Sequence, residues 1–152
     1  MVLVIFIAVC LAVSGIGAIV TTGSVRDWYP LLRKPSWTPP SCLFGPVWTI
    51  LYLMMATAAW LVWRRRESEH LNVALGLFAF QLFLNAAWSP LFFGLKSPLA
   101  GLLDIFPLWA AILATLLSFW RVSPFAGALL IPYWLWVSFA TALNYAIWKM
   151  NR

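Results

Sequence analysis

The sequence predicts an all-α membrane protein in which five transmembrane helices form one bundle. Of the 152 residues, 64% are hydrophobic and only 9% are charged, which is more apolar surface than a soluble domain of this size can bury. The charged residues fall into short clusters, and the uncharged stretches between them have the length of a membrane-spanning helix. Because no segment alternates apolar and polar residues with period two, membrane-spanning strands are excluded.

The predicted spans are residues 2–22, 42–63, 71–94, 98–119 and 124–148, within a single domain that covers residues 1–152. Each is close to the roughly 20 residues that an α-helix needs to cross about 30 Å of hydrocarbon. Segment 2–22 lacks a basic leader and stays uncharged until Arg26, so we interpret it as a helix and not as a cleavable signal. We therefore expect an integral, multi-pass membrane protein, although the charges do not define which membrane holds it.

The basic residues indicate contact with lipid. A formal charge of +6 is compatible with nucleic-acid binding, but the lysines and arginines lie at the ends of the predicted helices. Basic side chains at these positions meet lipid head groups. We therefore expect a lipid membrane as a partner and no nucleic acid.

The connection 23–41 is long for so small a protein. It contains Pro30, Pro35 and two further prolines, together with the amphipathic aromatic residues Trp28, Tyr29 and Trp37. Prolines stiffen the backbone and prevent a long helix, and long loops in compact domains are often functional. We interpret this segment as a stiff capping loop over one end of the bundle, with an ordinary interfacial aromatic belt as the alternative.

Three predicted helices carry stripes that combine aromatic rings with hydrogen-bonding groups. In the third helix these residues follow one another at i, i+4, i+7 and i+11, which places them on one face. The members are Gln81, Asn85, Trp88 and Phe92 on the third helix, Trp48 and Tyr52 on the second, and Tyr133, Trp136, Ala140 and Asn144 on the fifth. The stripes fit either a cleft for a flat apolar ligand with a polar edge or a packed core with amides that link helices.

Few residues offer catalytic or metal chemistry. His70 is the only histidine and lies at the start of the third helix, so we expect no metal site and interpret His70 as an interfacial residue more readily than as a haem ligand. Asp104 is the only acidic residue within a predicted span. It fits proton-coupled transport or a hydrogen bond to a neighbouring helix.

Segment 28–40, WYPLLRKPSWTPP, strongly resembles the WYxxLxKPxWxPP run of the TspO/MBR family, which comprises the translocator proteins or peripheral-type benzodiazepine receptors. The likeness continues through segments 45–48, 81–85, 92–94, 122–124, 132–133 and 139–145. It covers nearly the whole chain after the first helix.

The resemblance implies a five-helix fold, often homodimeric, with a pocket under the first loop for porphyrins and benzodiazepine-type or isoquinoline drugs. By position, the pocket residues are Tyr29, Pro40, Phe44, Trp48, Asn85, Trp136 and Ala140, and the stripes add Tyr52 and Trp88. Leu143, Tyr145 and Lys149 fit the loose cholesterol pattern L/V-x-Y-x-K/R.

The leading hypothesis is a tryptophan-rich sensor or translocator that binds protoporphyrin IX or haem as a ligand and needs no cofactor, with sterols and benzodiazepine-type drugs as further expected ligands. A light-dependent, porphyrin-degrading enzyme that uses Tyr29, Trp48 and Trp136 is the first alternative. Proton-coupled transport, resting on Asp104 alone, is the second.

Overall fold

A computed structural model describes residues 1–152. Helices are the only regular elements: α1 (Val2–Asp27), η1 (Tyr29–Leu31), η2 (Ser41–Leu43), α2 (Phe44–Trp63), α3 (Leu71–Ser89), η3 (Pro90–Gly94), α4 (Pro98–Val122), α5 (Pro124–Leu129) and α6 (Ile131–Met150). They form five helical segments that are long and apolar enough to cross a membrane. The predicted all-α membrane fold and its multi-pass character are therefore confirmed.

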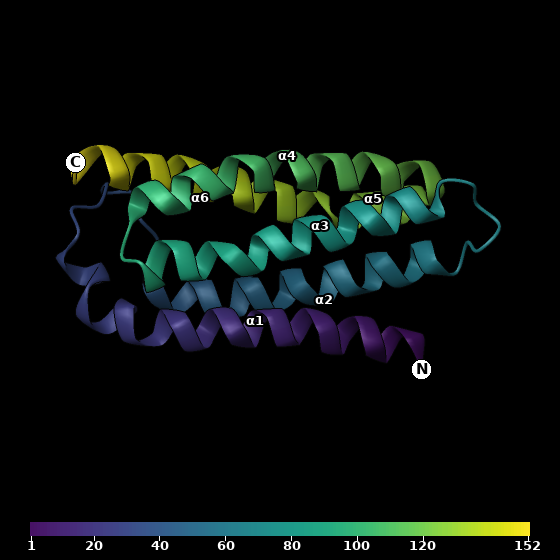
Figure 1. Ribbon diagram of the computed structural model, residues 1–152, viewed down its shortest axis with the longest axis horizontal. Coiled ribbons are helices and arrows are strands. Elements are labelled where there is room, and N and C mark those ends of the chain that lie inside the picture. The colour runs from purple at the N-terminus through teal and green to yellow at the C-terminus, as the bar shows by residue number, and fades with distance from the viewer.

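The long helices run side by side along one axis, so the bundle has two distinct ends (Figure 1). Segment 28–43 and the C-terminus lie at one end, which we call the loop end. The N-terminus and the connection between α2 and α3 lie at the other, which we call the far end. This placement follows from the odd number of spans.

The first helix is longer than predicted, since α1 continues past Thr22 to Asp27. Gly23 weakens a helix by only about 1 kcal/mol, and the Ser24 hydroxyl donates a hydrogen bond to the Phe93 carbonyl across the bundle at 2.7 Å. The helix stops at Trp28, because Pro30 lacks the N–H needed to continue it. The capping loop thus starts about five residues later than residue 23.

The third span changes pitch at Pro90. Proline cannot donate a hydrogen bond to the preceding turn, and the helix widens into the π-helical segment η3, in which the Leu95 N–H bonds to the Pro90 carbonyl at 2.9 Å. The wider turn buries two consecutive rings, those of Phe92 and Phe93. Their centroids lie 4.8 Å apart.

The fifth span is divided at Leu130 into α5 and α6, where the sequence predicted one helix over 124–148. Pro132 lies in the first turn of α6, a position at which its missing N–H does no harm. A proline does not by itself impose such a break, since Pro107 lies inside the uninterrupted α4.

The helices with the most buried residues are α4 and α2, while α1 lies at the periphery. Only Cys10 of α1 is fully buried. On α2, by contrast, Ala56, Ala58 and Ala59 are completely inaccessible, because small side chains let neighbouring helices approach closely.

Candidate functional site

The loop end contains a cavity of about 510 Å³. Its lining residues come from α1, η1, η2, α2, α3, η3, α4 and α6. Most of the predicted ligand-binding residues line it, namely Tyr29, Phe44, Trp48, Tyr52, Asn85, Trp88, Trp136 and Ala140. The structure therefore brings the three aromatic stripes together around one space.

Pro40 is the predicted pocket residue that does not line the cavity. It is exposed and precedes η2, with φ −56° and ψ 138°. Its fixed φ directs the chain into the short turn before α2. Pro40 therefore lies outside the lining of the cavity, at the point where the chain turns toward Phe44 and Trp48 of α2.

Aromatic rings from α2 and α6 form one wall. Trp48 packs against Tyr52 with ring centroids 5.7 Å apart and against Tyr133 at 6.2 Å. Trp136 packs edge-on against Phe44 at 5.9 Å, and its Nε1 is buried without a hydrogen-bond partner. These contacts hold the indole planes in fixed orientations, as a stacking surface for a flat ligand requires.

Asn85 is both a wall residue and a link between helices. The Tyr52 hydroxyl donates to its Oδ1 at 2.6 Å, and its Nδ2 donates to the Tyr133 hydroxyl at 2.6 Å. The Tyr133 hydroxyl in turn donates to Gln81 Oε1 at 2.9 Å. The packed-core interpretation is thus correct for Gln81, which is fully buried, while Asn85 borders the cavity with one amide N–H still unpaired.

The opposite wall comes from a stripe of small residues on α1 that consists of Ser14, Gly17, Ala18 and Thr21. Small residues at this spacing usually let two helices approach closely, but here they border the open space. One contact of the packing type exists, since a Cβ at Gly17 would lie 3.2 Å from Ser89 Oγ. The small side chains leave volume that larger residues would fill.

Tyr29 closes the cavity under the capping loop. Its ring is buried between Phe93, at 5.8 Å, and the Lys34 ammonium, at 4.8 Å. Lys34 also donates to the carbonyl oxygens of Tyr29 and Leu32, at 2.7 and 2.9 Å. Burial raises the pKa of the Tyr29 phenol, so the hydroxyl stays protonated at neutral pH.

The capping loop is also tied to the C-terminus. Asn151 Oδ1 accepts from the Arg33 backbone N–H at 2.9 Å, and Asn151 Nδ2 donates to the Arg33 carbonyl at 2.8 Å. Trp37 lies edge-on to Phe139 of α6 at 5.7 Å. These contacts fix the loop over the end of the bundle (Figure 1).

The residues of the sterol pattern do not share one surface. Leu143 is buried and lines the cavity, while Tyr145 is 46% exposed and Lys149 is exposed. Positions two apart on a helix lie on nearly opposite sides. Tyr145 and Lys149 therefore form an outward-facing pair that is separate from the cavity.

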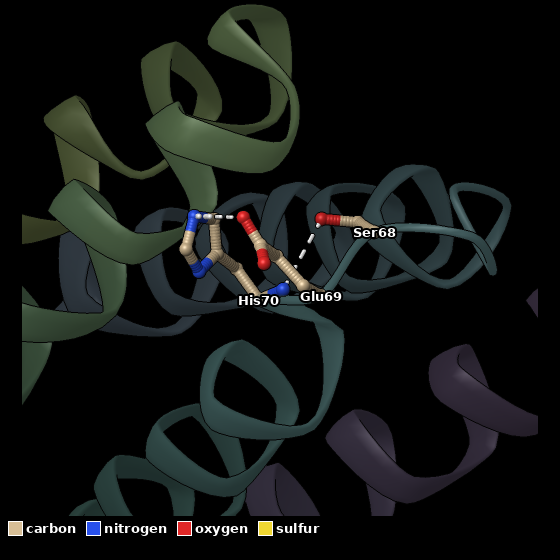
Figure 2. Close-up of polar contacts among 3 residues, drawn as sticks. All are labelled: Ser68, Glu69 and His70. Atoms are coloured by element: carbon tan, nitrogen blue, oxygen red, sulfur yellow. Dashed lines mark hydrogen bonds and ion pairs between the residues drawn. The ribbon is translucent and has the colours of Figure 1, made fainter.

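His70 lies at the far end, in the connection between α2 and α3. Figure 2 shows its ring turned toward Glu69, with Nε2 and Oε1 3.8 Å apart, and its backbone N–H directed to Ser68 Oγ at 3.4 Å. His70 does not line the cavity, and no three His, Cys, Asp or Glu side chains lie close enough together to hold a metal ion. The cavity wall thus contains no histidine or cysteine that could act as an axial ligand of haem iron.

Asp104 is buried in α4, and its Oδ2 has no hydrogen-bond partner. Neighbouring residues of α4, Ile105 and Leu108, line the cavity, but Asp104 does not. Asp104, the one acidic residue within the spans predicted from the sequence, therefore lies outside the lining of the candidate site.

The geometry defines a five-span helical membrane protein with an aromatic, intrabundle cavity under a capping loop. The model of the TspO/MBR family matches residues 6–149. The chain is 50% identical to the tryptophan-rich protein TspO of Chlorobaculum tepidum, over 95% of this chain and 92% of the relative. It is 41% identical to the translocator protein of Homo sapiens, over 90% and 82%, and 36% identical to the tryptophan-rich sensory protein of Cereibacter sphaeroides, over 96% and 89%.

The chain belongs to the TspO/MBR family. The resemblance that the loop motif first indicated is thereby confirmed over nearly the whole chain.

Proposed function

We propose that the protein binds a flat, largely apolar tetrapyrrole, such as protoporphyrin IX or haem, in the cavity at the loop end. The observation that supports this proposal is the lining of a 510 Å³ space by Trp48, Trp88 and Trp136 together with the amide of Asn85. Small-molecule sites typically enclose about 300–1,000 Å³, with mostly apolar walls and a few placed polar groups.

In this proposal aromatic stacking supplies most of the affinity. The indole planes contact the faces of the macrocycle, and the free amide N–H of Asn85 offers a donor to its polar atoms. Because the cavity lacks histidine, binding does not depend on a central metal. The names of two relatives, tryptophan-rich sensory protein and translocator protein, fit a ligand-binding role.

Titration of purified protein with protoporphyrin IX in the dark tests this function. We expect quenching of tryptophan fluorescence, and about fivefold weaker binding in Trp136→Ala, since the loss of one stacking partner costs on the order of 1 kcal/mol. Trp60→Ala is the matched control, because Trp60 is a tryptophan of α2 that does not line the cavity. Equal affinities in folded wild-type protein and Trp136→Ala would place the ligand elsewhere.

A second candidate function, light-dependent porphyrin degradation, is favoured by the position of Tyr29, Trp48 and Trp136 in the lining of the same cavity. A bound porphyrin sensitises dioxygen in light, and phenol and indole side chains are oxidisable neighbours. Product analysis in light and in darkness separates the two functions, because a binding protein returns the porphyrin unchanged. Loss of porphyrin in light that is slowed by Trp48→Phe and Trp136→Phe supports the enzyme.

Sterol binding at Tyr145 and Lys149, binding of benzodiazepine-type drugs and the homodimeric state stay predictions. Since Asp104 lies outside the cavity wall, we do not extend the proposal to proton-coupled transport.

A further inference from the structure

Arg26 is the only charged residue among the 27 residues that line the cavity. It lies in the last turn of α1 and is exposed. The other exposed residues of the lining are Ala18 and Thr22, which precede Arg26 on α1, Ser41 of η2, and Gly45 and Thr49 at the beginning of α2. The mouth of the cavity therefore lies between the C-terminal half of α1 and the beginning of α2, and Arg26 stands at its rim.

The guanidinium of Arg26 has no partner within the protein. It makes no ion pair, and no hydrogen bond of its side chain is present. Of the other basic residues at the loop end, Lys34 is bonded to loop carbonyls, and the guanidinium of Arg152 lies 5.6 Å from the Trp148 ring. The side chains of Arg33, Lys96 and Lys149 have no such contact, but these residues do not line the cavity. The negative C-terminal end of the α1 dipole favours the positive charge of Arg26. This interaction uses none of the five N–H donors of the guanidinium.

Two of the other polar groups at the rim cannot donate to an anion. The Thr22 hydroxyl donates to the Ala18 carbonyl at 2.6 Å, and the Thr49 hydroxyl donates to the Gly45 carbonyl at 2.9 Å. Each hydroxyl has one proton, which these bonds use. Arg26 is therefore the principal free donor at the mouth, supplemented by the hydroxyl of Ser41.

We propose that Arg26 recognises a carboxylate at the edge of the ligand, so that the site selects an anionic ring system over a neutral one. The apolar ring enters the cavity, while the carboxylate stays at the wet rim, where the planar guanidinium binds it in a bidentate manner. This inference rests on the proposed tetrapyrrole site and adds to it a preference in ligand charge.

The experiment compares protoporphyrin IX, which carries two carboxylates, with its neutral dimethyl ester in phosphatidylcholine nanodiscs. We expect Arg26→Gln to weaken binding of the diacid about two- to fivefold, the range for a solvent-exposed ion pair, and to leave the affinity for the diester unchanged. Arg26→Lys should recover part of the loss, because lysine restores the positive charge but not the planar, bidentate donor geometry of the guanidinium. Arg121→Gln is the control. It removes a positive charge in the last turn of α4, outside the cavity lining, and should change neither affinity.

Several results overturn the inference. Equal diacid affinities in wild type and Arg26→Gln show that the cation is not used, and an equal loss for both ligands shows that Arg26 acts through packing. A lipid phosphate offers the same oxyanion chemistry, so the titrations are repeated with phosphatidylglycerol in the discs. An effect of Arg26→Gln confined to these anionic discs assigns Arg26 to the lipid head group and refutes recognition of the ligand.

Failure of the proposed function has a different signature. In that case wild-type protein binds neither porphyrin in either membrane. Thermal unfolding of each variant shows that the binding differences arise in folded protein.

Discussion

The two ends of the bundle use the same helices but pack them differently. At the far end, Ala58 and Ala59 of α2 are fully buried, and Phe78 stacks on Phe119 at 5.8 Å with an interplanar angle of 26°. The space that remains there is a smaller groove of about 290 Å³ with only hydrophobic lining residues. At the loop end, the small residues of α1 face large indoles, and a cavity of about 510 Å³ remains. The volume of the side chains alone does not explain this difference.

The indoles at the loop end are prevented from collapsing onto α1 by contacts among themselves. Trp88 stacks on Phe92 at 5.1 Å, and its Nε1 donates to Asn144 Oδ1 at 3.3 Å. A Cβ at Gly101 would lie 2.7 Å from the Phe92 ring and 3.1 Å from Asn144 Oδ1, which shows how tightly this side is packed. The comparison teaches that rigid support on one side, together with small residues on the other, keeps a site open.

The largest effect is expected at the far end, for Gly127→Ala. A Cβ at Gly127 would lie 2.8 Å from Cε3 and 2.9 Å from the backbone Cα of Trp120. Because relief of this clash requires a shift of the Trp120 backbone, we expect a loss of about 2–3 kcal/mol in the free energy of unfolding. Thermal unfolding in micelles measures this loss. Gly76→Ala is the control, because no atom lies within 4 Å of the new methyl group; equal stability of the two variants would contradict close packing at Gly127.

The second prediction compares two hydroxyls of the Asn85 network. Tyr133→Phe leaves both the Asn85 N–H and Gln81 Oε1 without partners in a buried position, which costs about 1–3 kcal/mol. Tyr52→Phe removes only the donor to Asn85 Oδ1, at the cavity wall, where water or a ligand can replace it. The unfolding temperature of Tyr133→Phe should therefore be lower than that of Tyr52→Phe. The reverse order would show that the Tyr133 hydroxyl is not the main link of the Asn85 network.

Hydropathy and charge spacing were sufficient to predict the spans, because lipid requires about 20 apolar residues in each helix. The stripe spacing also predicted that Asn85, Trp88 and Trp136 would face one another, since one face of each helix must turn inward. The π-helical turn at Pro90 was missed, because a proline tolerates either a kink or a wider turn. As a result Phe93, adjacent to Phe92, was not expected in the wall.

Arg26 and the small residues of α1 were missed for another reason. A stripe of small residues has the same spacing whether it contacts a helix or borders a void, and only the three-dimensional support of the facing indoles decides between the two. Extension of α1 to Asp27 also placed Arg26 on a helix that was expected to end at Thr22. The available signal in the sequence was that the helical spacing of the small-residue stripe continues from Thr21 to Val25, beyond the predicted end of the helix.

A smaller effect is expected where the two kinds of packing meet on α6. Ala140 is a half-buried wall residue one turn from Trp136. Ala140→Thr adds volume and a hydroxyl to the cavity wall, so we expect porphyrin affinity to fall about fivefold, near the lower limit of overpacking costs, with little change in helicity or unfolding temperature. Ala142→Thr is a matched control, because Ala142 is exposed on the same helix; normal binding by Ala140→Thr would remove this face of α6 from the site.

The smallest effect, no change, is predicted for His70→Ala. His70 is the only imidazole of the chain, but it lies at the far end, where its Nε2 is 3.8 Å from Glu69 Oε1 (Figure 2). The cavity at the loop end contains no histidine or cysteine, so an iron atom in a bound porphyrin gains no side-chain ligand of the kind these residues provide. Haem and metal-free protoporphyrin IX should therefore bind wild-type protein with similar affinities, and both affinities should be the same in His70→Ala. Absorption spectra of the haem complex give an independent readout, because axial imidazole changes the Soret band. A strong preference for haem that disappears in His70→Ala would show that the ligand binds at the far end, and the assignment of function to the loop end would then be wrong.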